Sequence, residues 1–141
     1  MLWVLSIVFI ISLDQLIKGI INRKVNIVVT KPIFKKVFYI THLENFGVAL
    51  NIMDNKGFIF VPIIIVSLII IEYLLYTSNN MTLKLSLSFI LGGGIGNLID
   101  RLRKRSVTDF FEVHLFRFIL PIFNIADIFI FVGVILFSFN F

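Results

Sequence analysis

Four long apolar stretches constrain the fold of this chain more than any other feature of its sequence. They lie at about residues 2–21, 58–76, 83–99 and 120–141. A helix that crosses a bilayer needs about 20 mainly apolar residues, and each stretch reaches or approaches this length. Across the chain 59% of the residues are hydrophobic and 15% are charged, which leaves more apolar surface than a soluble domain of this size could bury. We therefore expect an all-α membrane protein with four transmembrane helices in a single domain, residues 1–141.

The first apolar stretch does not have the pattern of a cleavable signal peptide. It lacks a basic region before the apolar run and a small-residue cleavage site, and it contains Asp14. We therefore expect residues 2–21 to remain as the first membrane helix.

The connections between the apolar stretches differ in length. The short segment TSNNMT joins the second and third stretches, so these helices should be antiparallel neighbours. With four spans, the two long connections, at about residues 22–57 and 100–119, lie on the same side of the membrane. Within the first of them, VNIVV and KVFYITHLE alternate in part between apolar and polar residues. This pattern predicts a small β-sheet element between helices 1 and 2.

The basic residues of the chain gather on the side of the two long connections. Lys18 lies inside the first apolar stretch and Lys84 beside the short connection, whereas the other lysines and arginines lie in or beside the long connections. The positive-inside rule, applied to this distribution, places that side in the cytoplasm. The net charge of +5 is thus explained by residues flanking membrane helices, and we expect no nucleic-acid partner.

Charged residues inside the first apolar stretch are candidates for function, because their cost in a membrane has to be offset. Asp14 and Lys18 are four residues apart and share one face of a helix, with the acid first. The simpler alternative is a local ion pair in which the long side chain of Lys18 reaches the membrane surface.

A second polar group lies at the end of the third stretch. Asn97 and Arg101 are again four residues apart, so both side chains should point the same way. We expect Asp100, directly beside them, to pair with Arg101 as a structural clamp.

Two further aspartates have the placement of a catalytic pair. Asp109 leads into an aromatic run at the membrane surface, and Asp127 lies near the start of the fourth stretch, three residues after Asn124. If the two carboxyl groups meet, they cannot both ionise easily; one pKa rises and the pair holds one proton. Such a pair supplies a general base and a general acid for activating water. The alternative for Asp109 is a surface ion pair with Arg105.

Other kinds of site have less support in the sequence. The chain has no cysteine, and its two histidines, His42 and His114, are not in a metal-binding spacing, so we expect no metal and no cofactor. The segment GGGIG lacks the ending of a nucleotide-binding loop, and we interpret it as a site of close helix packing. No serine has the surroundings of a nucleophile elbow.

Two functions without catalysis also fit a small polytopic chain. In a transporter or channel, Asp14, Asp127 and Arg101 would line an ion or proton path. Such a path should distribute polar groups through the depth of the membrane, but here they gather at one end, apart from Asp14 and Glu72. A structural subunit held together by its glycine-rich helix would leave Asp109 and Asp127 unexplained. An enzyme is therefore favoured.

The chain resembles a known family over nearly its whole length. Its motifs LDQLIK (13–18), ENFGVAL (44–50), GGGIGNLIDR (92–101), VTDF (107–110) and FNIAD (123–127) occur in the order and spacing of the lipoprotein signal peptidases, also called signal peptidase II. The last three motifs are the most specific. One departure follows Asn45, where Val48 and Leu50 replace the alanine and aromatic residue that are usual in the family.

The resemblance implies a multi-pass aspartyl endopeptidase of the bacterial plasma (inner) membrane. Such an enzyme removes the signal peptide from diacylglyceryl-modified prolipoproteins, cutting before the lipid-bearing cysteine. Its expected partners are these signal peptides and membrane lipids, and we expect a monomer. The family's active site is extracytoplasmic, which contradicts the orientation from the charge distribution, and we follow the family.

The resemblance also implies roles for individual residues. Asp109 and Asp127 match the catalytic aspartates of the family. Seven residues match its supporting or substrate-binding positions: Asp14, Lys18, Asn45, Gly47, Asn97, Arg101 and Asn124.

Overall fold

The computed structural model describes residues 2–27, 30–34, 37–47 and 57–140. In this part of the chain the helices are α1 (Leu2–Lys24), α2 (Val61–Thr77, preceded by the 3-10 turn η2, Gly57–Phe60), α3 (Met81–Lys104) and α4 (Ile125–Ser138). The strands are β1 (Lys31–Phe34), β2 (Phe38–Asn45), β3 (Val107–Leu115) and β4 (Phe118–Ile119).

The predicted fold class, an all-α membrane protein with a small β-sheet element between helices 1 and 2, is confirmed: the chain is mostly helical, with apolar helices and a small antiparallel sheet. By length and composition α1, α3 and the segment Phe58–Thr77 can each cross a membrane. The fourth apolar stretch contains α4, an apolar helix of 14 residues. The segment before α4 is not helical: it holds β4 and an extended connection that ends at Asn124.

The sheet contains more of the chain than the sequence indicated. Its strand order is β1-β2-β3-β4, and all neighbouring strands are antiparallel. Strands β3 and β4 come from the connection between α3 and α4, which we had not predicted to be extended. In the central pair, Leu43 of β2 lies opposite Asp109 of β3, and Asn45 lies opposite Val107. This register brings together segments more than 60 residues apart in sequence.

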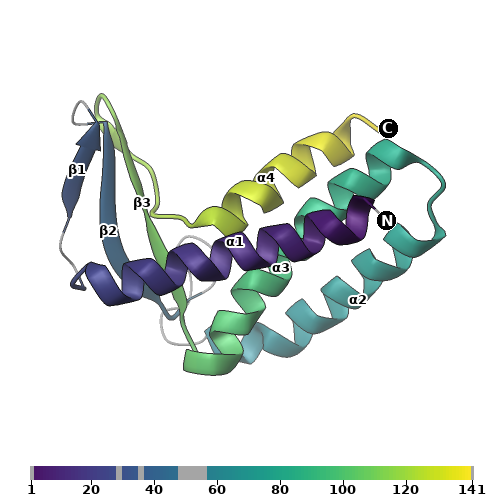
Figure 1. The fold of residues 1–141 in the computed structure, drawn as a ribbon, viewed down its shortest axis with the longest axis horizontal. Coiled ribbons are helices and arrows are strands. Elements are labelled where there is room, and N and C mark those ends of the chain that lie inside the picture. Colours follow the sequence, from purple (N-terminus) through teal and green to yellow (C-terminus); the bar gives the residue numbers. More distant parts are fainter. Residues whose placement is uncertain (1, 28–29, 35–36, 48–56, 141) are drawn as a thin grey trace.

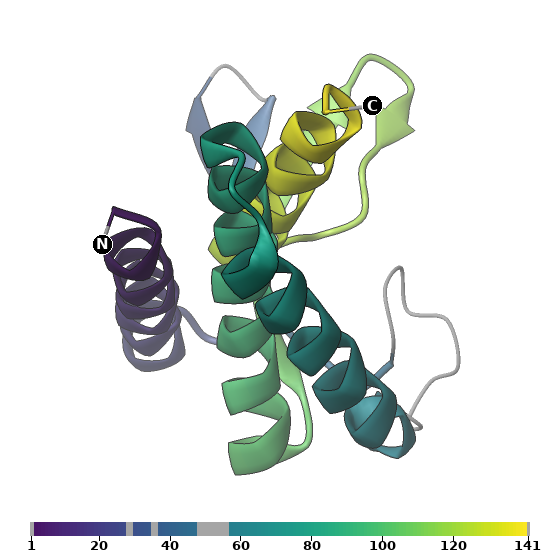
Figure 2. The same cartoon turned by 90° about the vertical axis from the view of Figure 1, so that its right-hand side faces the viewer.

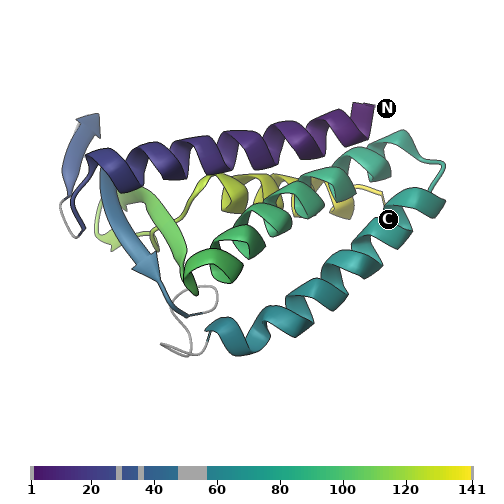
Figure 3. The same cartoon turned by 60° about the horizontal axis from the view of Figure 1, so that its bottom comes forward.

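The sheet and the helices occupy opposite ends of the molecule. The helices run side by side away from the sheet, and both termini lie near the turn between α2 and α3, at the far end (Figures 1 and 3). The C-terminal end of α1, the C-terminal end of α3 and the N-terminal end of α4 therefore meet next to the sheet. The polar motifs of the sequence all fall at this junction.

Helix α3 lies between the other three helices (Figure 2). Its glycine run allows this because each glycine faces a different neighbour. A Cβ atom added at Gly93 would lie 2.5 Å from the carbonyl oxygen of Ala126 in α4. One at Gly94 would lie 2.6 Å from Leu68 in α2, and one at Gly92 would lie 3.1 Å from a side chain of α1. The interpretation of GGGIG as a helix-packing segment is confirmed.

Candidate active site

A cavity opens where β3, α3 and α4 meet, and both candidate catalytic aspartates line it. Its volume is about 860 Å³. One end is polar, whereas the wall formed by α4 is apolar. The described lining residues are Asn45, Asn97, Arg101, Val107, Asp109, Leu120, Pro121, Ile122, Phe123, Asp127, Ile128, Ile130, Phe131 and Val134.

Asp109 is held by amide groups on both of its carboxyl oxygens. Its position in β3, opposite Leu43, buries the side chain to 3% exposure. Asn45 Nδ2 donates a hydrogen bond to Oδ2 at 2.9 Å, and Asn124 Nδ2 donates one to Oδ1 at 2.7 Å. The alternative pairing with Arg105 is not found, since the Arg105 guanidinium lies over the Phe58 ring, 5.4 Å from its centroid.

Asp127 is fixed by the start of α4. Asn124 is the N-cap of this helix, and its side-chain oxygen accepts a hydrogen bond from the backbone N–H of Asp127 at 2.9 Å. In return Asp127 Oδ2 accepts from the backbone N–H of Asn124 at 3.2 Å, which completes a capping box. The other oxygen, Oδ1, accepts from Asn97 Nδ2 at 2.8 Å. An acidic group is favourable here because the N-terminus of a helix carries partial positive charge.

Asn124 joins the two aspartates. Its side chain is completely buried. One amide hydrogen is directed to Asp109 Oδ1, and the amide also donates to Asn97 Oδ1 at 3.1 Å, while its oxygen caps α4. Both amide hydrogens and the amide oxygen are therefore engaged within the site, which fixes the orientation of the side chain.

Asn97 is in turn held by Lys18. Lys18 Nζ donates to Asn97 Oδ1 at 2.9 Å and forms ion pairs with Asp14 at 2.8 Å and Asp100 at 3.0 Å. The simpler alternative is therefore right about the ion pair with Asp14 but wrong about the membrane surface, because Lys18 is only 2% exposed. Asp14 Oδ1 also accepts from the backbone N–H of Ala126, 3.0 Å away in α4.

The prediction that Asp100 pairs with Arg101 as a structural clamp is wrong. Asp100 pairs with Lys18 of α1 instead, and its oxygens also accept from Gln15 Nε2 at 3.1 Å and from the Thr108 backbone N–H at 3.3 Å. Adjacent residues of a helix point in different directions, which separates the two side chains. Asp100 thus ties α1 to the start of β3.

Arg101 faces the cavity with Asn97, as their spacing predicted. The charges of Asp109 and Asp127 act on its guanidinium group. Among the described residues it has no carboxylate partner within ion-pair distance. The guanidinium is therefore available to a ligand.

The environment of Asp109 raises its pKa to about 6. Burial of the carboxyl group is the main cause, and the negative charge of Asp127 adds to it. Hydrogen bonds from Asn45 and Asn124 act in the opposite direction, because they stabilise the ionised form. A carboxyl group with this pKa can exchange a proton near neutral pH.

The loop after β2 fixes the orientation of the Asn45 side chain. The backbone N–H of Gly47 donates to Asn45 Oδ1 at 2.9 Å, so the amide nitrogen of Asn45 is left to face Asp109. Val48 and Leu50, at which the motif departs from the family pattern, lie outside the described residues.

In the described part of the chain, no group of three or more His, Cys, Asp or Glu side chains is arranged to hold a metal ion. His42 and His114 instead lie against Glu44 and Glu112, at 3.2 and 2.6 Å.

Sequence reasoning missed a second polar network beside the site. Glu44 Oε1 pairs with Lys104 at 2.7 Å, and Glu44 Oε2 accepts from Ser106 at 2.5 Å; Thr108 hydrogen-bonds to both Glu44 and Lys104. Burial alone would raise the pKa of Glu44, but the hydrogen bonds from Lys104, Ser106 and His42 hold it below its ordinary value. No local spacing signals this network, because its members meet only through the pairing of β2 with β3. It anchors the strand that carries Asp109 to the end of α3.

Comparison with known proteins agrees with this architecture. A family model described as signal peptidase (SPase) II matches residues 6–141. Two solved structures described as bacterial membrane enzymes, determined by the in meso method at 2.3 and 1.9 Å resolution, superpose with TM-scores of 0.91 and 0.89. Each is 32% identical to this chain; they cover 98% of it, and the chain covers 85% and 90% of them respectively.

The fold is thus shared with bacterial membrane enzymes. The chain belongs to the signal peptidase II family, whose members are aspartic-type hydrolases that act on lipoprotein signal peptides.

Proposed function

We propose that this protein removes the signal peptide from diacylglyceryl-modified prolipoproteins, cutting directly before the lipid-bearing cysteine. The observation that carries the proposal is the placement of Asp109 and Asp127 in one cavity, bridged by Asn124 and bounded on one side by apolar residues of α4. A polar reaction centre next to an apolar wall suits a peptide bond beside a lipid anchor.

In the proposed reaction Asp109 and Asp127 act as the catalytic dyad. One carboxylate takes a proton from water, and the other, protonated, polarises the carbonyl of the scissile bond. The water oxygen then attacks this carbonyl carbon, the C–N bond breaks, and the amine of the cysteine leaves with a proton that the dyad took from the water. The pKa of about 6 for Asp109 supports a role in proton transfer near neutral pH.

The neighbouring groups suit the rest of the substrate. Arg101 lies at the polar end, where its guanidinium can donate hydrogen bonds to peptide carbonyls. Along α4, Ile128, Phe131 and Val134 offer an apolar surface for the acyl chains. The amides of Asn45, Asn97 and Asn124 hold the two carboxyl groups at fixed positions, so the site needs little reorganisation during the reaction.

We propose that the protein is a monomer of the bacterial inner membrane, with the sheet on the extracytoplasmic side. A signal peptide that spans the membrane presents its cleavage site there. Three of the basic residues that predicted the reverse orientation have structural partners: Lys104 pairs with Glu44, Arg103 contacts Gln15, and Arg105 lies over Phe58. These three residues are therefore poor indicators of topology.

Cleavage of a diacylglyceryl-modified prolipoprotein by purified protein in detergent tests the proposal. The same substrate without its lipid and the Asp127→Asn variant are the controls. We expect cleavage of the lipidated substrate alone, lost in the variant. If well-folded protein leaves the lipidated substrate intact, the proposed function is wrong, and a proton-flux assay would then test a transport function.

A further inference from the structure

A second cavity lies beside the candidate active site. Its volume is about 330 Å³, at the lower end of the range for ligand pockets. It shares Asn45, Leu120, Pro121 and Ile122 with the larger cavity, so the two lie side by side along the segment that leads into α4. Leu43, Glu112 and Ile119, all from the sheet, complete the lining, and we call this cavity the sheet pocket.

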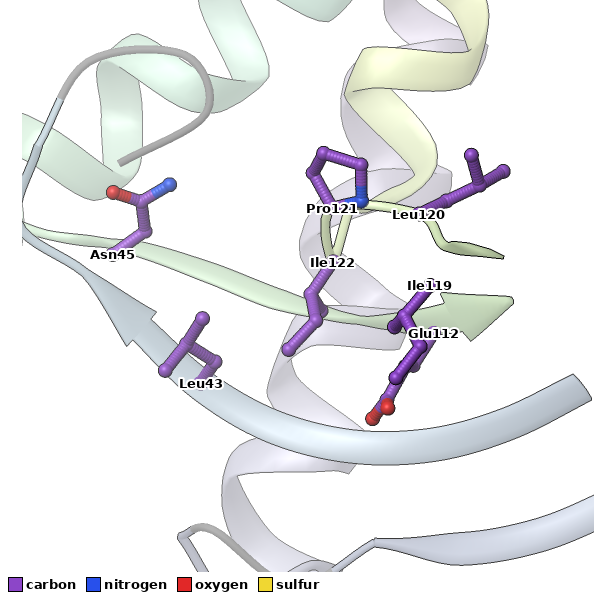
Figure 4. A pocket seen from close by; sticks show the side chains of 7 residues that line it. All are labelled: Leu43, Asn45, Glu112, Ile119, Leu120, Pro121 and Ile122. Carbon is purple, nitrogen blue, oxygen red and sulfur yellow. The ribbon is translucent and has the colours of Figure 1, made fainter. Parts of the chain in front are cut away.

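The sheet pocket runs along strands β2 and β3 (Figure 4). Asn45, next to the dyad, is at one end, Glu112 and Ile119 are at the other, and Leu43 and Ile122 lie between them (Figure 4). The apolar wall of the larger cavity runs in the other direction, along α4. A substrate at the dyad therefore has two exits, one apolar along the helix and one of mixed character over the sheet.

Among the described residues that line the sheet pocket, Glu112 is the one with a charged side chain. Its side chain is 15% exposed, and Oε1 contacts Nε2 of His114 at 2.6 Å. The ring of His114 packs against Tyr39, with centroids 4.3 Å apart, so the carboxylate is held in place. Among the described residues Oε2 has no hydrogen-bond partner, which leaves an acceptor for a ligand.

We infer that the sheet pocket binds the extended chain immediately after the lipid-bearing cysteine, and that Glu112 selects a basic side chain there. This inference rests on the proposed function. The acyl chains and the apolar signal peptide are drawn to the wall of α4 and the bilayer, whereas the released mature chain has to leave toward water. The sheet pocket leads in that direction, and its charge complements a lysine or arginine.

The test compares lipidated substrates that carry Lys, Ala or Glu at the first, second or third position after the cysteine. At one position we expect kcat/KM to be about 5- to 10-fold higher for Lys than for Glu, mainly through KM, as for a hydrogen-bonded charge pair in a partly exposed site. In Glu112→Gln this ratio should fall to near one, and in Glu112→Lys it should reverse. Glu72→Gln, which alters an exposed acid of α2 away from both cavities, should keep the wild-type ratio.

The result separates this inference from the function on which it rests. Cleavage that is equally fast with Lys and Glu at all three positions would overturn the charge selection and leave the peptidase activity intact. A ratio that is unchanged in Glu112→Gln would also overturn it. If the folded wild-type protein cleaves none of the lipidated substrates, the proposed function fails, and this inference fails with it. The thermal midpoint of each variant shows that the comparison is made between folded proteins.

Discussion

Lys18 of α1 and Asn97 of α3 are joined by a 2.9 Å hydrogen bond in the interior of the protein, although 79 residues separate them in sequence. Because the ammonium group can only donate, it requires the oxygen of the Asn97 amide on its side. The amide nitrogen is thereby directed to Asp127, 2.8 Å away. A residue that touches no part of the proposed substrate thus orients a group of the catalytic site.

Lys18→Met should destabilise the protein strongly. It leaves the buried carboxylates of Asp14 and Asp100 without their shared cation, and the loss of one member of a buried ion pair costs about 3–5 kcal/mol. Thermal unfolding in detergent measures the effect. Lys24→Met, an exposed lysine of the same helix, is the matched control, and equal midpoints for the two variants would contradict the structural role of Lys18.

Asp109→Asn and Asp127→Asn should each lower the rate of lipoprotein cleavage by about 10²–10⁴-fold, the usual contribution of a general acid or base. Each variant removes a carboxyl group that can transfer a proton but keeps the size of the side chain. Single-turnover cleavage followed by gel shift gives the rate, and Glu72→Gln serves as the control. Substantial cleavage by either Asn variant would show that the dyad is assigned incorrectly.

The pH profile of kcat/KM should have a midpoint near 6, the pKa of Asp109. If kcat/KM falls below this pH, Asp109 acts as the proton acceptor, because its carboxylate becomes protonated there. If kcat/KM falls above this pH, Asp109 acts as the proton donor instead.

Asn45→Ala should move this midpoint to higher pH. The hydrogen bond from Asn45 stabilises the ionised carboxylate, so its removal raises the pKa of Asp109 further. The profile is measured with both proteins under the same detergent conditions. An unchanged midpoint would show that the observed titration does not belong to Asp109.

Gly93→Ala should destabilise the protein by about 1–3 kcal/mol, the usual cost of overpacking. Its methyl group would lie 2.5 Å from the backbone oxygen of Ala126, so α4 has to shift, and with it Asp127. Cleavage should therefore also slow. Gly19→Ala is the matched control, since an added methyl group there meets nothing within 4 Å. Similar midpoints and rates in the two variants would refute the packing argument.

Local patterns in the sequence were sufficient for the first three helices, for the presence of the fourth, and for parts of the site. Hydrophobic length identified the apolar helices, because the distance across a bilayer is set by lipid rather than by the protein. Residues three or four apart on a helix are neighbours whatever surrounds them. This explains why Asp14 with Lys18, Asn97 with Arg101, and Asn124 with Asp127 could be grouped in advance. The assignment of Asp109 and Asp127 as the catalytic dyad depended in part on the family resemblance.

Only the tertiary structure decided which of these groups meet. The pairing of β2 with β3 places Asn45 against Asp109, and the packing of α1 on α3 gives Asp100 its partner in Lys18 rather than Arg101. Such contacts depend on how separate elements pack, which leaves no periodic trace in the sequence. The burial of Lys18 has the same origin, since a side chain long enough to reach the membrane surface is also long enough to reach a second helix.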